Sequence, residues 1–452
     1  MPQLSEAIAR YHQLLESPAY QDFSWAAALQ EKMRERRLTE SGRLVAPVLR
    51  PHFVSARQYQ LLAQTAERVA AVLNRMEALI LEAPALMSRL QMLPAEKMLA
   101  AIPPGYPRLN VSSALDAYQA ESSFGFNSFQ PSTPAGVAYQ DELADLFLDL
   151  PVVKEFKRGR YKLSKPGNGK QLPGALLRVW KEFGGKTTPQ AAVLEFKTPS
   201  SEDSNEGGLM ADLFTRAGIP TRVLSPEQLE YKGGVLRSGD YTIDLVFRRL
   251  FAHDLLLRYD LSHPLLMAYR DRAVCVVNSF RAELGRRRAL FALLTDEQFT
   301  GSWPAAERRL IAHHVPWTRL MLQQRTGHRG HSVDLPRFVS RNREHFVLAP
   351  NEVPSLQPTF YGREVSQPAW DRAINSAMRT PYVVQEAVAA IKRPFPVFQY
   401  GELQIRELNV MFHPHILLDR MQGLSATLSQ SANGAVVPTS YAPVLLLEDN
   451  NA

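Results

Sequence analysis

The segment from Ala191 to Leu250 reads AAVLEFKTPSSEDSNEGGLMADLFTRAGIPTRVLSPEQLEYKGGVLRSGDYTIDLVFRRL and carries the clearest α/β pattern in this chain. The short apolar runs at 191–196 and 221–225 are typical of strands, and residues 208–219 have helical spacing that closes at Gly218. LEYKGGVLRSG predicts a hairpin, and YTIDLVFRRL predicts one further strand. This alternation predicts a doubly wound α/β unit.

Ligands of doubly wound sheets bind beyond the carboxyl ends of the strands. In this segment that rule indicates the loop KTPSSEDSNEGG at 197–208, and Arg248 with Arg249 after the last strand. We therefore predict that Arg248 contacts a substrate. An exposed loop and a pair of solvated arginines would give the same pattern, and that alternative stays open for each feature taken alone.

The first hundred residues read as helices. SARQYQLLAQTAERVAAVLNRMEALILEA begins at Ser55, which is a plausible N-cap, and its apolar residues return at helical spacing. That apolar stripe is expected to be core or a partner surface, and it comprises Leu62, Ala66, Val69, Leu73, Met76 and Ile80. The Pro-rich segment AIPPGYPRLNVSS then interrupts the pattern near residue 101, where we place a domain boundary.

Composition excludes several classes of protein. No run of about eighteen apolar residues occurs, so neither a membrane span nor a signal peptide is expected, and a cytoplasmic location follows by default. The only cysteine, Cys275, lies in the apolar run AVCVV and is expected to be an inert buried thiol. The net charge of +7 is thinly spread, and no recognised nucleic-acid-binding module accompanies it, which argues against nucleic-acid binding.

Four stretches carry a family resemblance: PSTPAGVAYQDELADLFLDLP from Pro131, AYRDRAVCVVNSFRAELGRRRALFALLTDE from Ala268, PYVVQEAV from Pro381, and LSATLSQSANGAVVPT from Leu424. Together they resemble the circularly permuted ATP-grasp family, which includes glutathionylspermidine-synthase-like proteins. The likeness spans roughly residues 125 to 440. It implies an α/β, ATP-grasp-like architecture of two lobes with a helical N-terminal region. The corresponding divisions are 1–100 for the helices, 101–270 for a substrate-side domain and 271–452 for the nucleotide lobes.

The resemblance also implies a reaction and its site. Members of the family use ATP and Mg²⁺ to phosphorylate a carboxylate, which an amine then attacks, so a small acid, an amine or a peptide is the implied substrate. Gln385 and Glu386 in VVQEAV match the strand that receives adenine. Arg288 occupies the position of a phosphate-binding lysine, and it is the implied catalytic residue.

A magnesium site is implied by an acidic residue and an asparagine two positions apart on one strand, because that spacing places both side chains on one face. IRELNV supplies Glu407 and Asn409 in this pattern. An ordinary exposed strand would produce the same alternation, so this alternative stays open. Asn433 lies in another matched segment, and its role is undefined.

The phosphate-binding motifs depart from the family pattern. Arg288 keeps the charge of the lysine but replaces a compact ammonium with a planar fork. Ala349 occupies the position of a second lysine of the family pattern. A general use of arginine in place of lysine would not explain an alanine at that position. The loop after it is usually acidic and glycine-rich, but here it carries Pro354 and Pro358, which stiffen the backbone and donate no hydrogen bond.

No lysine lies between Lys232 and Lys392, although arginine is frequent there. Three hypotheses follow from these departures. The chain is a protein of the ATP-dependent ligase type with a degenerate, weak or inactive nucleotide site, or it is an active ligase in which arginines replace the lysines. The third hypothesis is a non-catalytic binding or assembly protein that meets a partner through its N-terminal helices.

Overall fold

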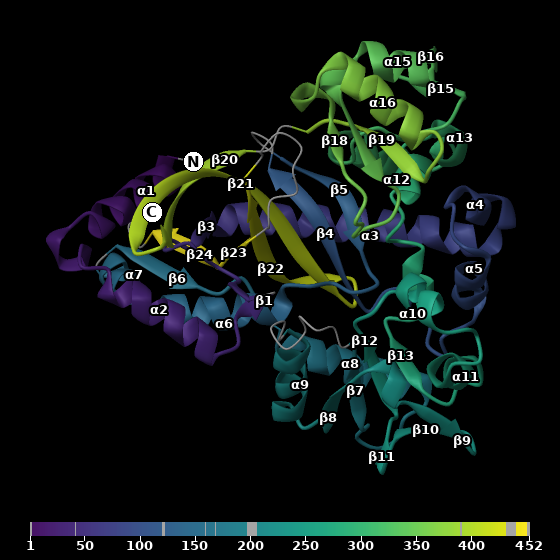
Figure 1. Cartoon of the computed structure of the whole chain (residues 1–452), viewed down its shortest axis with the longest axis horizontal. Helices are drawn as coiled ribbons and strands as arrows, with labels where there is room; N and C mark the ends of the chain where they lie inside the picture. The colour runs from purple at the N-terminus through teal and green to yellow at the C-terminus, as the bar shows by residue number, and fades with distance from the viewer. Residues whose placement is uncertain are drawn as a thin grey trace.

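Helix α3 (Ala56–Glu82) crosses the middle of the molecule and lies against one face of its largest sheet (Figure 1). The computed structural model describes residues 2–40, 42–119, 123–158, 160–167, 169–196, 206–388, 391–430 and 440–449. The predicted N-cap is confirmed: Ser55 Oγ accepts a hydrogen bond from the Gln58 amide, and Gln58 Oε1 accepts one from the Ser55 amide. All six residues of the predicted stripe are buried in the core, so the stripe does not face a partner.

The sheet against α3 joins strands from the two ends of the chain. Its strands run in the order β23-β22-β21-β4-β5, with β20 also paired to β21, and all neighbours are antiparallel. Alternate residues such as Leu115 and Phe412 pack in the core, and the opposite face is polar. The strands are β4 (Ser112–Gln119), β5 (Phe124–Gln130), β20 (Lys392–Gln399), β21 (Glu402–Leu417), β22 (Arg420–Ser429) and β23 (Ser440–Ala442).

The predicted α/β unit is a parallel sheet of order β13-β12-β7-β8. It comprises β7 (Ala191–Leu194), β8 (Thr221–Leu224), β12 (Leu245–Arg248) and β13 (Cys275–Val277), with α9 (Glu206–Arg216) between β7 and β8. The last strand lies beyond the boundary predicted at residue 270. Cys275 is buried there, and burial raises the pKa of its thiol, as expected for an inert cysteine.

YTIDLVFRRL is two strands, so the prediction of one strand was wrong. β11 (Tyr241–Thr242) pairs with the predicted hairpin, which is formed by β9 (Glu230–Lys232) and β10 (Val235–Ser238). Between β11 and β12, the Ile243 amide still donates to Leu236 in the hairpin, whereas the Asp244 carbonyl accepts from Cys275 in the parallel sheet. The chain therefore changes sheets at this point.

A separate lobe contains the antiparallel sheet β14-β19-β17-β18, seen at the upper right of Figure 1. Its strands are β14 (Thr318–Leu320), β17 (Phe346–Pro350), β18 (Phe360–Tyr361) and β19 (Tyr382–Glu386). Helices α15 (Leu335–Arg341) and α16 (Gln367–Ala377) pack against it, and Trp370 is fully buried between them and the sheet. The hairpin of β15 (Arg325–His328) and β16 (His331–Asp334) belongs to the same lobe.

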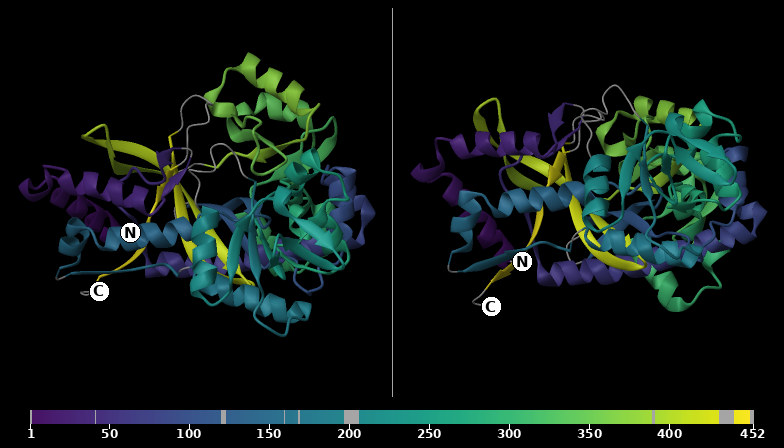
Figure 2. Two further views of the ribbon diagram at one scale, coloured as in Figure 1. Left: turned by 60° about the horizontal axis from the view of Figure 1, so that its bottom comes forward. Right: turned by 90° about the horizontal axis from the view of Figure 1, so that it is seen from below.

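The N-terminal helices share a core with the middle and the end of the chain. α1 (Pro2–Leu15) and α2 (Ser24–Glu35) pack with α7 (Pro151–Lys157) and with the sheet β3-β24-β6. That sheet is formed by β3 (His52–Ser55), β6 (Tyr161–Ser164) and β24 (Val444–Asp449). Figure 2 shows the purple N-terminal helices beside the yellow strands of the C-terminal segment. The helical region at 1–100 is therefore not packed by itself.

The remaining elements connect these parts. They are α4 (Pro84–Arg89), α5 (Pro94–Ala101), α6 (Val137–Leu148), α8 (Gln171–Phe183), α10 (Ala252–Arg258), α11 (Pro264–Arg270), α12 (Ala289–Leu294), α13 (Glu297–Thr300), α14 (Ala305–His314), β1 (Thr39–Glu40) and β2 (Arg43–Leu44). None of the helices in the described ranges combines the length and the apolar character that crossing a bilayer requires.

Candidate functional site

The polar face of the large sheet is organised around Asp116 on β4. His413 Nδ1 lies 2.8 Å from Asp116 Oδ1, and Gln130 Nε2 donates to both carboxylate oxygens at 3.0 Å. Ser128 donates a further hydrogen bond to Oδ2. Burial acts to raise the pKa of Asp116, but the bonds from His413, Ser128 and Gln130 hold this pKa below its ordinary value. Asp116 is therefore ionised at neutral pH.

Arg288 lies at the start of α12, beside this polar face. Its amide donates to Asn351 O at 2.7 Å, and its guanidinium Nη1 donates to Pro350 O at 2.8 Å. Burial lowers the pKa of Arg288, and the nearby charge of Asp116 opposes that effect. The predicted catalytic cation is therefore placed between the end of β17 and the polar face.

Gln385 and Glu386 are adjacent on β19, as the resemblance implies, and both are bonded to protein groups. Gln385 Nε2 donates to Thr318 Oγ1 at 3.0 Å and to Asn127 O at 3.3 Å. Glu386 Oε1 lies 3.0 Å from His328 Nε2 and 3.2 Å from Arg329 Nη2. Gln385 thus links the lobe to the large sheet. The adenine role of both residues stays a prediction.

Arg248 is buried at the end of β12 and its guanidinium is surrounded by the protein. Nη1 lies 2.5 Å from Glu283 Oε1, and the other nitrogens donate to the carbonyls of Asn278 and Ser279 at 3.0 and 3.1 Å. The side chain is 0% exposed. The described residues already bond this guanidinium on several sides, and the predicted substrate contact stays a prediction.

The neighbouring Arg249 faces the carboxyl ends of β7 and β12 instead. It lies 3.2 Å from both Glu195 and Glu206. Successive residues of an extended chain point to opposite sides, so only one of the two adjacent arginines turns toward Glu195 and Glu206. The sequence FRRL does not reveal which one, and most of the predicted ligand loop, 197–205, lies outside the described residues.

Glu407 and Asn409 share one face of β21, as their spacing predicts. Leu408 and Val410 are buried on the opposite face, whereas Glu407 is exposed. His413, which contacts Asp116, lies four residues further along the same strand, roughly 13 Å away at the usual rise of a strand. The metal-binding role of Glu407 and Asn409 stays a prediction. Asn433 lies outside the described residues.

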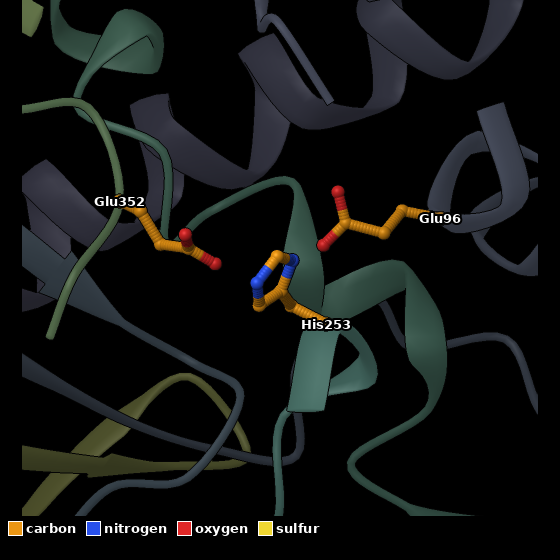
Figure 3. Close-up of side chains that lie close together, drawn as sticks. All are labelled: Glu96, His253 and Glu352. Atoms are coloured by element: carbon orange, nitrogen blue, oxygen red, sulfur yellow. The ribbon is translucent and has the colours of Figure 1, made fainter. Parts of the chain in front are cut away.

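Figure 3 shows the His253 ring between the carboxylates of Glu96 and Glu352. Their ligand atoms lie within 4.8 Å of one another, a spacing that a metal site would also have. Both carboxylates are already held by arginines: Glu96 Oε1 is 2.5 Å from Arg287 Nη2, and Glu352 Oε1 is 2.6 Å from Arg286 Nη1. Two cations thus neutralise the pair, and the cluster is an ion-pair network rather than a metal site.

The sequence RRR at 286–288 consequently serves two purposes. Arg286 and Arg287 are nearly inaccessible to solvent and hold the buried carboxylates, including Glu283 at 3.2 Å from Arg286. Arg288 is the member of the three that lies near the polar face. Charge alone therefore does not distinguish Arg288 from the two arginines before it.

Ala349 and the segment after it are integrated into the core. Ala349 is 4% exposed and pairs with Val383 inside the hydrophobic cluster around α3. The following residues are anchored: Asn351 Nδ2 donates to Leu90 O at 2.9 Å, and Val353 O accepts from Arg286 Nε at 2.9 Å.

Sequence and structure comparisons assign a fold. Neither a protein-family model nor a curated protein matches the sequence. A glutathione synthetase-like effector from Globodera pallida, solved in its apo form, matches with a TM-score of 0.61 at 11% identity, over 96% of this chain and 99% of the effector. Two other solved structures match at lower TM-scores. They are a putative gamma-glutamylcysteine synthetase from Methylobacillus flagellatus (0.43, 12% identity, 86% of this chain and 87% of that chain) and a RimK-domain ATP-grasp protein from Sphaerobacter thermophilus (0.28, 15%, 57% and 90%).

The match to the effector covers nearly the whole of both chains, so this protein shares the effector's fold. The predicted α/β architecture, of the kind seen in a glutathione synthetase-like protein, is thereby confirmed. An identity of 11% carries the likeness no further than the fold. Activity has to be argued from the residues of the site.

Proposed function

We propose that this chain is a protein of the ATP-dependent carboxylate-amine ligase type whose nucleotide site is degenerate, and therefore weak or inactive. The motifs at Pro131, Ala268 and Pro381 support the ligase type, as does the fold shared with a glutathione synthetase-like effector. The degeneracy rests chiefly on Ala349, which puts a buried methyl group where a phosphate-binding lysine belongs.

The residues present fit Mg²⁺ and ATP poorly. A phosphoryl-transfer site needs cations around the phosphates and oxygen ligands for the metal ion. Arg288 is one cation of this kind, but Pro354 in the adjoining segment has no amide to offer a phosphate. The carboxylates of Asp116 and Glu386 are bonded to His413 and to His328 with Arg329. We therefore derive no catalytic step through ATP.

Binding of Mg²⁺ and ATP is the direct test of this proposal. A ligand present at a hundred times its Kd stabilises a protein by about 2.7 kcal/mol. Millimolar ATP with Mg²⁺ is expected to leave the Tm unchanged relative to Mg²⁺ alone, as measured by differential scanning fluorimetry. A rise of about 2 °C or more would contradict the degenerate site.

The active-ligase alternative is favoured by one observation, the cation of Arg288 beside the polar face. In that case ATP raises the Tm and Arg288→Ala abolishes the rise, whereas Arg281→Ala, at an arginine outside the site, preserves it. Release of ADP in the presence of small acids and amines would then identify the substrate pair. The non-catalytic alternative needs a partner surface other than the apolar stripe of α3, because that stripe is buried.

A further inference from the structure

A chain of three side chains crosses the polar face of the large sheet. Asp116 on β4 accepts from His413 on β21, and the other ring nitrogen, His413 Nε2, lies 2.8 Å from Thr427 Oγ1 on β22. The side chains of Asp116 and His413 are each 15% exposed, and Thr427 is half-buried. Three neighbouring strands therefore hold a carboxylate, an imidazole and a hydroxyl in line.

The proton positions in this chain follow from the charge of Asp116. An ionised carboxylate can only accept hydrogen bonds. The proton in the bond between His413 and Asp116 therefore stays on Nδ1 of His413. In a neutral imidazole the other nitrogen, Nε2, is then an acceptor. Thr427 consequently donates its hydroxyl proton to His413. This is the arrangement that activates a hydroxyl as a nucleophile in acyl transfer.

A second histidine on the same face, His415, also contacts a hydroxyl group but has no carboxylate beside it in the part of the chain that the structure describes. His415 Nε2 lies 2.9 Å from Ser425 Oγ, but its Nδ1 has no hydrogen-bond partner among the described residues, and both side chains are almost completely buried. Burial lowers the pKa of His415 to about 3. This pair lacks both an orienting carboxylate and access from solvent, so it provides a matched control inside the same sheet.

We propose that Thr427, His413 and Asp116 form an acyl-transfer site that takes activated acyl donors, such as aryl esters or acyl phosphates. Thr427 Oγ1 attacks the acyl carbon, and its proton passes to His413 Nε2. The new Oγ1–carbon bond forms as the bond to the leaving group breaks. The imidazolium gives its proton to the departing oxygen or to solvent, which leaves His413 Nε2 free to act as a base again. Water then attacks the acyl-threonine as His413 takes its proton. The carbon–Oγ1 bond breaks, and the proton on the imidazole returns to Thr427.

Arg288 lies at the Asp116 end of this chain of three side chains. Its guanidinium lies near enough to Asp116 for the carboxylate charge to act on it. It therefore adds positive charge near the orienting carboxylate. The site needs no nucleotide, so it does not depend on the proposed ligase ancestry.

The test uses p-nitrophenyl acetate and the full-length protein. Stopped-flow absorbance is expected to show a burst of p-nitrophenolate close to one equivalent per chain, and mass spectrometry is expected to place one acetyl group on Thr427. Thr427→Val and His413→Gln are expected to slow acylation by about a hundredfold or more. Thr427→Ser is expected to retain the burst, and so is the control Ser425→Ala.

Absence of acetyl-Thr427 from the wild-type protein would overturn the proposal, whatever the variants do. So would a Thr427→Val protein that acylates at the wild-type rate. If Thr427→Val melts well below the wild type, its acylation rate is not informative. The rates of Thr427→Ser, which keeps a nucleophile, and His413→Gln, which removes the base, are then compared instead. Equal rates for those two variants would also contradict the proposal.

Discussion

At the scale of single residues, burial of Glu77 on α3 sets part of the pH dependence of stability. Its side chain is almost fully buried, and Asn110 Nδ2 donates to it at 2.6 Å. Burial raises the pKa of Glu77 to about 8, whereas the unfolded chain has the ordinary value near 4.5. The folded protein therefore holds a proton that the unfolded chain loses, and stability falls as the pH rises from about 4.5 to 8.

Glu77→Gln removes this loss because an amide does not ionise. The free energy of unfolding at pH 8 is expected to exceed that of the wild type by on the order of a few kcal/mol, and the two proteins should converge near pH 4.5. Urea unfolding at both pH values measures the difference. A difference that is the same at both pH values would contradict the assignment to Glu77.

Arg248 is expected to stabilise the fold rather than to bind a substrate. Arg248→Met leaves the Glu283 carboxylate with fewer partners and should cost about 3–5 kcal/mol in the free energy of unfolding, as for other broken buried pairs. The exposed pair of Arg34 and Glu31 provides the control, since Arg34→Met should change stability by less than about 1 kcal/mol. Equal effects in urea unfolding would argue for an accessible, functional Arg248.

At the scale of elements, α3 depends on its first turn. Ser55→Ala removes the capping hydrogen bond to the Gln58 amide and should cost about 1 kcal/mol. Ser366 occupies the same position before α16 but makes no side-chain capping bond, so Ser366→Ala should cost less. Thermal unfolding of the two variants compares them. A larger loss for Ser366→Ala would show that capping does not explain the effect.

Elements with local signals were predictable from the sequence, and those defined by distant partners were not. The helix at Ser55 and the strand at Ala191 are set by nearby caps and apolar runs. The break at Ile243 and Asp244 was missed because each half of YTIDLVFRRL suits a strand, and only hydrogen bonds to two different sheets separate the halves.

Predictability of the site follows the same rule. Arg288 was predicted because a family motif surrounds it, and its role stays a prediction. Asp116 and His413 are 297 positions apart, so only the register of β4 and β21 brings them together. The sequence HPH at 413–415 does not separate its two histidines, and the structure distinguishes them by the carboxylate that only His413 contacts.

At the scale of the whole molecule, the N-terminal helices are expected to be essential for folding. Tyr11 of α1 contacts the rings of Phe53 and Phe156, and its hydroxyl donates to Leu49 O at 2.9 Å. A chain shortened to begin at Pro51 would expose this core to water. We expect it to be insoluble or to lack a cooperative thermal transition, as judged by circular dichroism. A cooperative transition near the wild-type Tm would show that the helices form an independent unit.

The sheet β3-β24-β6 also has a consequence for synthesis of the protein. Its central strand is β24, which pairs in parallel with β3 and antiparallel with β6. A ribosome makes residues 52–55 and 161–164 long before it makes residues 444–449. Part of the apolar surface of the first helices therefore stays exposed until nearly the entire chain has been synthesised. We expect chaperones that bind such surfaces during translation to bind the nascent chain of this protein.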